Sequence, residues 1–115
     1  MNITIQNPTE DIAIIIIHGK FTIEDVNAFK EKTGPLVKDP MKTILVNFSE
    51  LNYIDSSGIG ALILLMNTAK NLNIDLILYN IQKEIKSVFK IAYLDKFFHI
   101  VTSEELKKSF PSLSL

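Results

Sequence analysis

Hydrophobic and polar residues change their period along this chain, and each change predicts a different element. Isoleucines alternate with polar residues over 2–6, which is the period of a half-buried strand. The continuous apolar run over 12–17 is typical of a strand covered on both faces. The proline-containing segment Asn7–Thr9 is expected to turn between them, and Gly19 to end the second strand. The start of the chain therefore predicts a hairpin.

Helical spacing follows the hairpin. Thr22 with Asp25 three residues later resembles a capping box at a helix start, and Gly34 followed by Pro35 is expected to break that helix. The residues expected to face inward are Val26, Phe29 and Thr33. The next strand is predicted at Thr43–Phe48, with Ser49–Tyr53 as a connecting segment.

The period returns to that of a helix at Ile59. One apolar face combines Ile59, Leu62, Ile63, Met66 and Ala69, widened by Leu65 and Leu72. Leu64 falls on the opposite side, either as an isolated surface leucine or as a contact residue. Further elements are a strand at Asp75–Tyr79, a helix over Gln82–Ala92, a short strand at Phe97–Val101, and a last helix capped by Ser103. The residues that repeat helical spacing around the first of these helices are Ile81, Ile85, Val88, Phe89 and Ala92.

This alternation of strands and helices predicts the α/β class. We expect residues 1–115 to form a single domain, with one mixed β-sheet, an antiparallel N-terminal hairpin at its edge and about four covering helices. No internal repeat or linker interrupts the chain.

Composition narrows the possible functions. Twelve basic residues are dispersed among 13 acidic ones, giving a net charge of -1, so neither a nucleic-acid track nor a polybasic membrane patch is expected. The chain contains no cysteine, which excludes disulfide and thiol chemistry. No signal peptide or membrane-spanning run is recognisable, and we expect a soluble cytoplasmic protein.

The stretch Asn52–Gly60 carries the candidate chemistry because it lies between a predicted strand and a predicted helix. Asp55 is followed by Ser56 and Ser57, and then by Gly58 and Gly60. A hydroxyl at a helix N-terminus is well placed to carry a phosphate, since the backbone N–H groups there favour negative charge. The structural alternative is that Asp55 and the serines only cap the helix, while the glycines only permit a tight turn and close packing.

Two catalytic interpretations fit this stretch poorly. A serine hydrolase requires glycine two residues before its nucleophile, where this chain has Ile54, and His18 and His99 lie in apolar surroundings typical of structural histidines. A phosphate-accepting aspartate that uses Mg²⁺ requires an acidic pair after the first strand. The only early acidic pair, Glu10–Asp11, precedes its strand, and Asp55 has no neighbouring ligand for a metal. We expect no metal, no cofactor and no enzymatic activity.

The run Asp55–Gly60 resembles the Asp-Ser-Ser/Thr-Gly-Leu/Ile-Gly motif of STAS-domain anti-sigma factor antagonists. The resemblance extends over nearly the whole chain and includes 44–48 and 88–91. It implies a STAS fold and a partner-switching module without catalytic activity. The unphosphorylated form would bind a GHKL-type anti-sigma serine kinase and so release the sigma factor, and phosphorylation of Ser56 would end that binding. Asp55, Ser57, Gly58 and Gly60 would support the phosphosite.

The same resemblance implies a serine phosphatase as a further partner and a monomer or weak dimer. The alternative is a non-switching STAS scaffold or a ligand-binding accessory domain, of the stressosome-like or transport-associated kind. The family usually has Gly-Glu-Leu/Ile-Asp after its second strand, whereas this chain has Gly19-Lys20-Phe21-Thr22. Tyr93 stands where many members have glycine. The residues expected to face the partner are Lys20, Phe21, Thr22, Ile23, Ile59 and Leu64.

Overall fold

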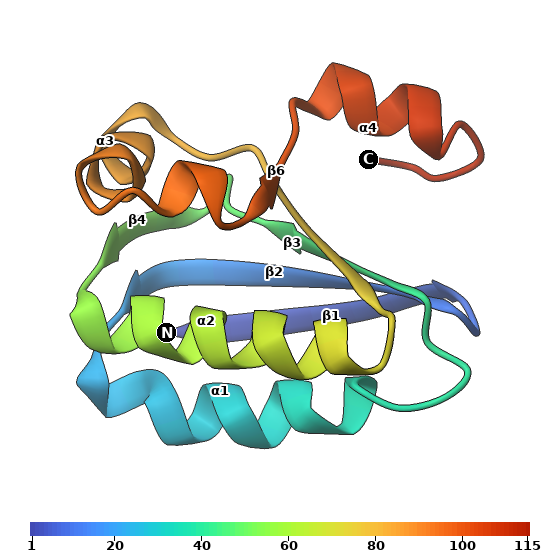
Figure 1. Cartoon of the computed structure of the whole chain (residues 1–115), viewed down its shortest axis with the longest axis horizontal. Coiled ribbons are helices and arrows are strands. Elements are labelled where there is room, and N and C mark those ends of the chain that lie inside the picture. The colour runs from blue at the N-terminus through green and yellow to red at the C-terminus, as the bar shows by residue number, and fades with distance from the viewer.

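A computed structural model describes residues 1–115 and contains one six-stranded sheet (Figure 1). The strands are β1 (Asn2–Thr9), β2 (Ile12–Phe21), β3 (Thr43–Asn47), β4 (Leu51–Ile54), β5 (Asp75–Tyr79) and β6 (His99–Ile100). The order across the sheet is β1-β2-β3-β5-β6, and β4 pairs with β2 beyond the end of β3. Only the β1–β2 pair is antiparallel, so the predicted mixed sheet with an N-terminal hairpin edge is confirmed.

The hairpin is longer than the sequence predicted. β1 continues through Pro8 to Thr9 with an irregular register after Gln6, and the turn falls at Glu10–Asp11 instead of Asn7–Thr9. A proline is tolerated there because β1 is an edge strand, whose outward side needs no N–H donor. The predicted turn, Asn7–Thr9, was therefore too early in the sequence, because β1 continues through those residues.

Gly19 was predicted to end β2, but the strand continues to Phe21. Gly19 instead marks the point where β2 changes its partner strand. Its φ of 85° lies in the left-handed region that glycine adopts without strain, and the register shifts between Gly19 and Lys20. Before this point β2 pairs with β3, and after it β2 pairs with β4. The segment predicted as a connection, Ser49–Tyr53, thus contains most of a strand, which its exposed Asn52 and Tyr53 concealed.

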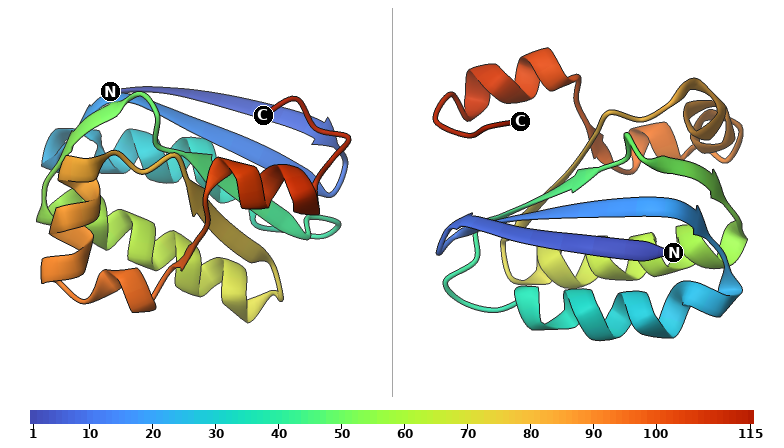
Figure 2. Two further views of the ribbon diagram at one scale, coloured as in Figure 1. Left: turned by 90° about the horizontal axis from the view of Figure 1, so that it is seen from above. Right: turned by 180° about the vertical axis from the view of Figure 1, so that it is seen from behind.

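Four α-helices cover the sheet, as predicted: α1 (Val26–Thr33), α2 (Ser56–Asn71), α3 (Lys83–Ile91) and α4 (Ser103–Ser109). Short 3-10 turns occupy Ile23–Asp25, Gly34–Leu36 and Leu94–Lys96. Figures 1 and 2 show α1 and α2 side by side on one face of the sheet and α4 over the opposite face. None of the helices has the length and apolar character required to cross a membrane.

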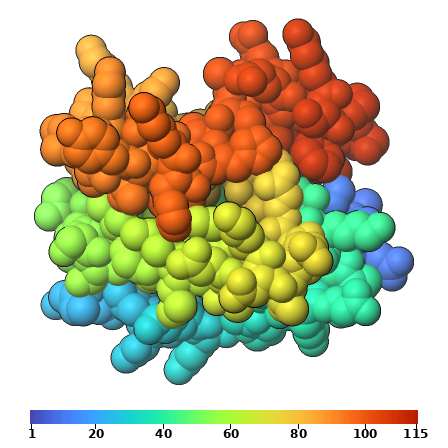
Figure 3. Space-filling view, viewed as in Figure 1, coloured from blue at the N-terminus to red at the C-terminus, as the bar shows by residue number.

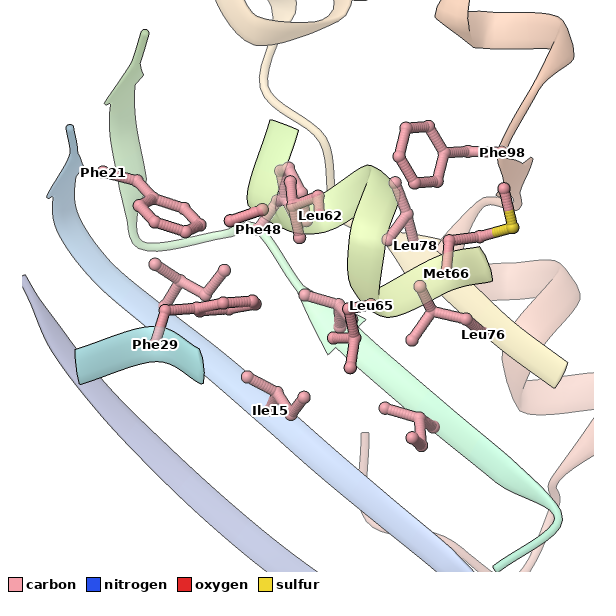
Figure 4. Packing of buried hydrophobic residues seen from close by; sticks show 14 of the residues in the cluster. Ile15, Phe21, Phe29, Phe48, Leu62, Leu65, Met66, Leu76, Leu78 and Phe98 are labelled. Carbon is pink, nitrogen blue, oxygen red and sulfur yellow. The ribbon is translucent and has the colours of Figure 1, made fainter. Parts of the chain in front are cut away.

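The larger hydrophobic core lies between the sheet and helices α1, α2 and α3. Figure 4 shows Phe21 and Phe29 close together in it, and their ring centroids are 4.7 Å apart. The smaller core, on the opposite face, contains Leu45, Ile77 and Leu106, the last from α4. Burial on both faces explains why the central strands are continuous apolar runs.

Several predicted inward faces were only partly right. In α1, Phe29 and Thr33 are buried and Val26 is half-buried. Leu72, predicted to widen the inner face of α2, is 53% exposed because the helix has already ended at Asn71. Of the residues that repeat helical spacing in and around α3, Ile85 and Phe89 are buried, while Val88 and the C-cap residue Ala92 are exposed. The cap of α4 is Thr102, not Ser103: its hydroxyl accepts a hydrogen bond from the Glu105 N–H.

Candidate functional site

The candidate site forms where two parallel strands end together. β2 and β4 pair with Lys20 opposite Tyr53 and Phe21 opposite Ile54. Each strand then leads into a helix, β2 through the 3-10 turn Ile23–Asp25 into α1, and β4 directly into α2. The loop after β2 and the Asp-Ser-Ser-Gly motif therefore lie side by side, although more than 30 residues separate them in sequence.

Asp55 joins these two segments. It is the N-cap of α2, and its Oδ1 accepts a hydrogen bond of 2.9 Å from the Gly58 N–H. Its Oδ2 accepts a second bond of 3.2 Å from the Ile23 N–H, and its own N–H donates to the Phe21 carbonyl at 3.1 Å. One carboxylate thus caps the helix and also holds the loop after β2 in place.

Ser56 is the first residue of α2 and is exposed, whereas Ser57 is half-buried. Neither hydroxyl forms a hydrogen bond within the chain, because Asp55 already supplies the cap. Helix α2 is 16 residues long, and the positive end of its dipole lies at these two serines. Of the two hydroxyls, that of Ser56 is the more accessible to a second protein.

The two glycines of the motif have different surroundings. A Cβ at Gly58 would lie 2.7 Å from the Phe21 carbonyl oxygen and 2.9 Å from Cγ1 of Ile54. Gly58 therefore lets α2 approach the ends of β2 and β4 closely. A Cβ at Gly60 would meet no atom within 4 Å, so the close packing expected of both glycines applies to Gly58 alone.

The loop residue Thr22 is held by Asp25. The Asp25 carboxylate accepts hydrogen bonds from the backbone N–H of Thr22 at 2.9 Å and from its hydroxyl at 3.2 Å. The backbone hydrogen bond from Thr22 is the main cause that lowers the pKa of Asp25 below its ordinary value. Asp25 therefore orders the loop, and Thr22 serves as a cap for the following helical turn.

The residues expected to face a partner divide into exposed and buried ones. Lys20 is exposed, Ile23 is 66% exposed and Leu64 is 50% exposed, while Thr22 and Ile59 are half-buried. Phe21 is fully buried against Phe29, so its inclusion in a contact surface was wrong. The side chain points into the core because neighbouring strand residues alternate in direction, and Lys20 takes the outward position.

Sequence reasoning did not identify Tyr53 as a surface residue of the site. It is 50% exposed and lies opposite Lys20 in the parallel pair. Its position in a strand was hidden because β4 is buried only at its two ends, Leu51 and Ile54, and has no alternating pattern. Recognition of β4 as a strand would have placed Tyr53 in the sheet, although the choice of β2 as its partner strand depends on tertiary contacts.

A groove of about 280 Å³ runs beside the exposed face of α2, between that helix and α1. Figure 3 shows α2 as a band of surface between α1 and the segment that contains α3 and β6. The groove is lined by Leu64, Leu65 and Ala61 of α2 and by Phe29, Lys30 and Val37 from α1 and the turn that follows it, among others. Leu64 thus borders an apolar depression.

The surroundings of the histidines and carboxylates bear on catalysis. His18 is hydrogen-bonded to the Thr4 hydroxyl and His99 to the Asp75 carboxylate, each at 3.1 Å, so neither is paired with a motif serine. No group of three or more histidine, aspartate or glutamate side chains is arranged to hold a metal ion. The site offers an accessible hydroxyl at a helix N-terminus, and the hydrogen bonds of both histidines are made elsewhere.

Comparison with known proteins gives matches over nearly the whole chain. The sequence profile of the STAS domain family matches residues 4–107. The anti-sigma-B factor antagonist of Staphylococcus aureus (strain NCTC 8325 / PS 47) is 27% identical over 111 residues, which cover 93% of this chain and 100% of the relative.

Two solved structures have the same fold. The anti-sigma factor antagonist SpoIIAA in its unphosphorylated form has a TM-score of 0.73 and 21% identity, covering 97% of this chain and 100% of the other. The Bacillus cell fate determinant SpoIIAA in the phosphorylated form also has a TM-score of 0.73, with 23% identity, covering 94% of this chain and 98% of the other.

Proposed function

This chain belongs to the STAS domain family, and on that premise we propose that it is an anti-sigma factor antagonist regulated by phosphorylation of Ser56. The unphosphorylated protein binds an anti-sigma factor serine kinase of the GHKL type, and the sigma factor is thereby released. The kinase phosphorylates Ser56, and the complex dissociates. The protein itself supplies no catalytic group and acts by binding.

One observation carries the proposal: Ser56 is an exposed hydroxyl at the start of α2, next to an aspartate that has already capped the helix. The hydroxyl makes no internal bond that phosphorylation would have to break. The similarity to the S. aureus anti-sigma-B factor antagonist, and to a SpoIIAA that has been observed phosphorylated, supports assigning a switch to this position.

The electrostatics of α2 favour a switch that leaves the fold intact. A phosphate adds about 1.5 to 2 negative charges at neutral pH, and the free N–H groups of the first helical turn favour that charge. In a protein interface the same charge must lose its hydration, and it repels acidic groups of the partner. At a buried contact these two effects weaken binding by several kcal/mol. Binding is therefore lost while the domain remains folded.

We place the partner surface around Ser56, on Lys20, Ile23, Tyr53 and Leu64. Ile23 and Tyr53 have exposed side chains on either side of the phosphosite, which provide a contact area for the partner. Leu64, also exposed, extends this contact area along α2. Lys20, which replaces a usual acidic residue of the family, adds a positive charge to this surface. We expect Lys20 to favour a kinase whose docking surface is more acidic than is usual.

The test is to incubate the purified protein with an anti-sigma factor kinase from the same organism and ATP, and to measure phosphate incorporation by intact mass. One phosphate is expected on the native chain and none on Ser56→Ala. Ser57→Ala is the matched control, because it removes the neighbouring hydroxyl, and it is expected to retain labelling.

Binding is measured in the same samples before and after phosphorylation. We expect the affinity for the kinase to fall at least tenfold once the protein is phosphorylated, since a fall of this size corresponds to about 1.4 kcal/mol. Binding that is unchanged by phosphate would favour the non-switching scaffold function. Labelling of Ser56→Ala to the same extent as the native chain would refute the assignment of the phosphosite.

A further inference from the structure

The outer edge of β1 is open and carries no charge. β1 pairs only with β2, and Figure 2 shows it along the border of the sheet, with no helix beyond it. Residues 2–6 contain only asparagine, isoleucine, threonine and glutamine. Exposed edge strands usually carry charges, prolines or bulges that prevent pairing with another strand. Here Pro8 and the irregularity after Gln6 affect only the far end of β1.

The sequence of this edge is close to a palindrome. If two copies of β1 pair in antiparallel orientation with a twofold axis at Thr4, then Thr4 faces Thr4, Ile3 faces Ile5, and Asn2 faces Gln6. Every cross-strand pair then combines residues of one kind: hydroxyls, β-branched aliphatic side chains or amides. Such pairs stabilise antiparallel strands, and no like charges oppose one another.

Burial in the single chain agrees with this register. Ile3 and Ile5 point toward the larger core but are only half-buried, while Asn2, Thr4 and Gln6 are exposed on the other face. Opposite residues of an antiparallel pair point to the same face of the sheet. Pairing would therefore bring the half-buried isoleucines of two chains together, next to both cores.

We propose that a second copy of this chain pairs with β1 to form a twofold dimer with one continuous sheet. A twofold contact uses the β1 edge of both copies, and β6 at the opposite edge has only two residues, so the assembly stops at two copies. The amino end of β1 lies beside His18, toward the Ser56 end of β2. Because the paired strands are antiparallel, the two Ser56 sites lie toward opposite ends of the dimer and stay accessible.

Disulfide trapping tests the register, because the native chain has no cysteine. In the proposed dimer the two Cα atoms at position 4 are about 4.5 to 5.5 Å apart. That spacing lies within the range of about 4.4 to 6.8 Å required by a disulfide. Thr4→Cys is therefore expected to form a disulfide-linked dimer under mild oxidation. Asn7→Cys, exposed on the same strand, is the control: its two copies would be offset by six residues, or about 20 Å, and should not link.

A charge-swap experiment tests the same contact without a covalent bond. The native chain is expected to dimerise weakly in sedimentation equilibrium, with a dissociation constant on the order of 100 µM, because five paired residues form a small interface. Thr4→Lys and Thr4→Glu should each be monomeric at the same concentration, and their equimolar mixture should dimerise again. Circular dichroism establishes that both variants fold.

Three outcomes would overturn the proposal. The first is a native chain that remains monomeric up to millimolar concentration. The second is equal linking of Thr4→Cys and Asn7→Cys, which would indicate random collision. The third is a folded mixture of the lysine and glutamate variants that remains monomeric, because charges facing each other on the twofold axis must attract.

Discussion

A side chain at position 58 would collide with backbone at the end of β2. The nearest atom is the Phe21 carbonyl oxygen, 2.7 Å from the added Cβ, and Cγ1 of Ile54 follows at 2.9 Å. We expect Gly58→Ala to lower the free energy of unfolding by about 1 to 3 kcal/mol, because α2 must move away from the sheet. Urea unfolding measures the change.

Gly60→Ala is the matched control in the same helix. Its Cβ meets nothing within 4 Å, so only the preference of alanine over glycine in a helix remains, worth about 1 kcal/mol in the stabilising direction. Opposite signs for the two substitutions are therefore expected. If both destabilised the protein equally, the close approach of α2 to β2 would not be the reason for glycine at position 58.

At the scale of the secondary-structure element, the first turn after β2 depends on the ionised carboxylate of Asp25. Its pKa is lowered mainly by the hydrogen bond from the Thr22 N–H. A carboxyl group with a lower pKa in the folded state stabilises the fold above its ordinary pKa of 3.8, and the contribution is lost as the pH falls through the folded-state value. Stability should therefore decline below about pH 4.

Asp25→Asn tests this dependence. The native chain is expected to be more stable than the variant at pH 6, and the difference should shrink as the pH is lowered from 4 to 2, about the range in which the carboxylate is protonated. Urea unfolding at each pH measures the two proteins in parallel. A difference that stayed constant down to pH 2 would show that the negative charge of Asp25 is not what stabilises this turn.

The residue that follows the C-cap of α3 allows a prediction about the cost of a left-handed backbone conformation. Tyr93 has a φ of 59° and is 79% exposed, so its side chain gains little packing in return for a left-handed conformation. Tyr93→Gly is expected to raise the free energy of unfolding by about 1 kcal/mol, because glycine adopts this conformation without the Cβ clash. Thermal and urea unfolding measure the effect.

The neighbouring residue supplies the comparison. Ala92 has a φ of -86°, and Ala92→Gly should lower stability, since glycine there only increases the freedom of the unfolded chain. A loss of stability in Tyr93→Gly would mean that the exposed tyrosine makes contacts whose value exceeds the backbone strain.

The sequence predicted elements wherever periodicity and burial agreed. β5 matches its predicted bounds Asp75–Tyr79, and the start of α2 was located from the motif at Asp55. The missed features are those decided by tertiary contacts. Gly19 looked like a strand end because its effect, a change of strand partner, has no local signature. Phe21 was assigned to the surface because neither the continuation of β2 nor its contact with Phe29 can be read from local spacing.

For the candidate site, the sequence supplied the residues of the motif but not the contacts that join them to the loop after β2. Asp55 was expected at the helix start, and the structure adds its bond to the Ile23 N–H, which depends on β2 and β4 ending together. The pairing of Lys20 with Tyr53 has the same origin. Non-local strand pairing of this kind cannot be obtained from a single sequence pattern, because the two segments carry no information about each other.

At the scale of the whole molecule, the proposed switch requires that a charge at Ser56 leave the fold unaffected. A negative charge at the first residue of α2 interacts favourably with the positive end of the helix dipole, by about 0.3 to 1 kcal/mol. Ser56→Asp should therefore be at least as stable as the native chain, while its binding to the kinase falls. Urea unfolding and a binding titration on the same preparation measure both quantities.

Asn71→Asp places the same charge at the last residue of the same helix, where the dipole is negative. It is expected to lower stability by about 0.3 to 1 kcal/mol and to leave kinase binding unchanged, the reverse of the result for Ser56→Asp. This reciprocal pattern would separate binding from folding. If Ser56→Asp instead lost stability together with binding, the switch would act by unfolding the domain, and the helix N-terminus would not be the reason that the fold tolerates phosphate.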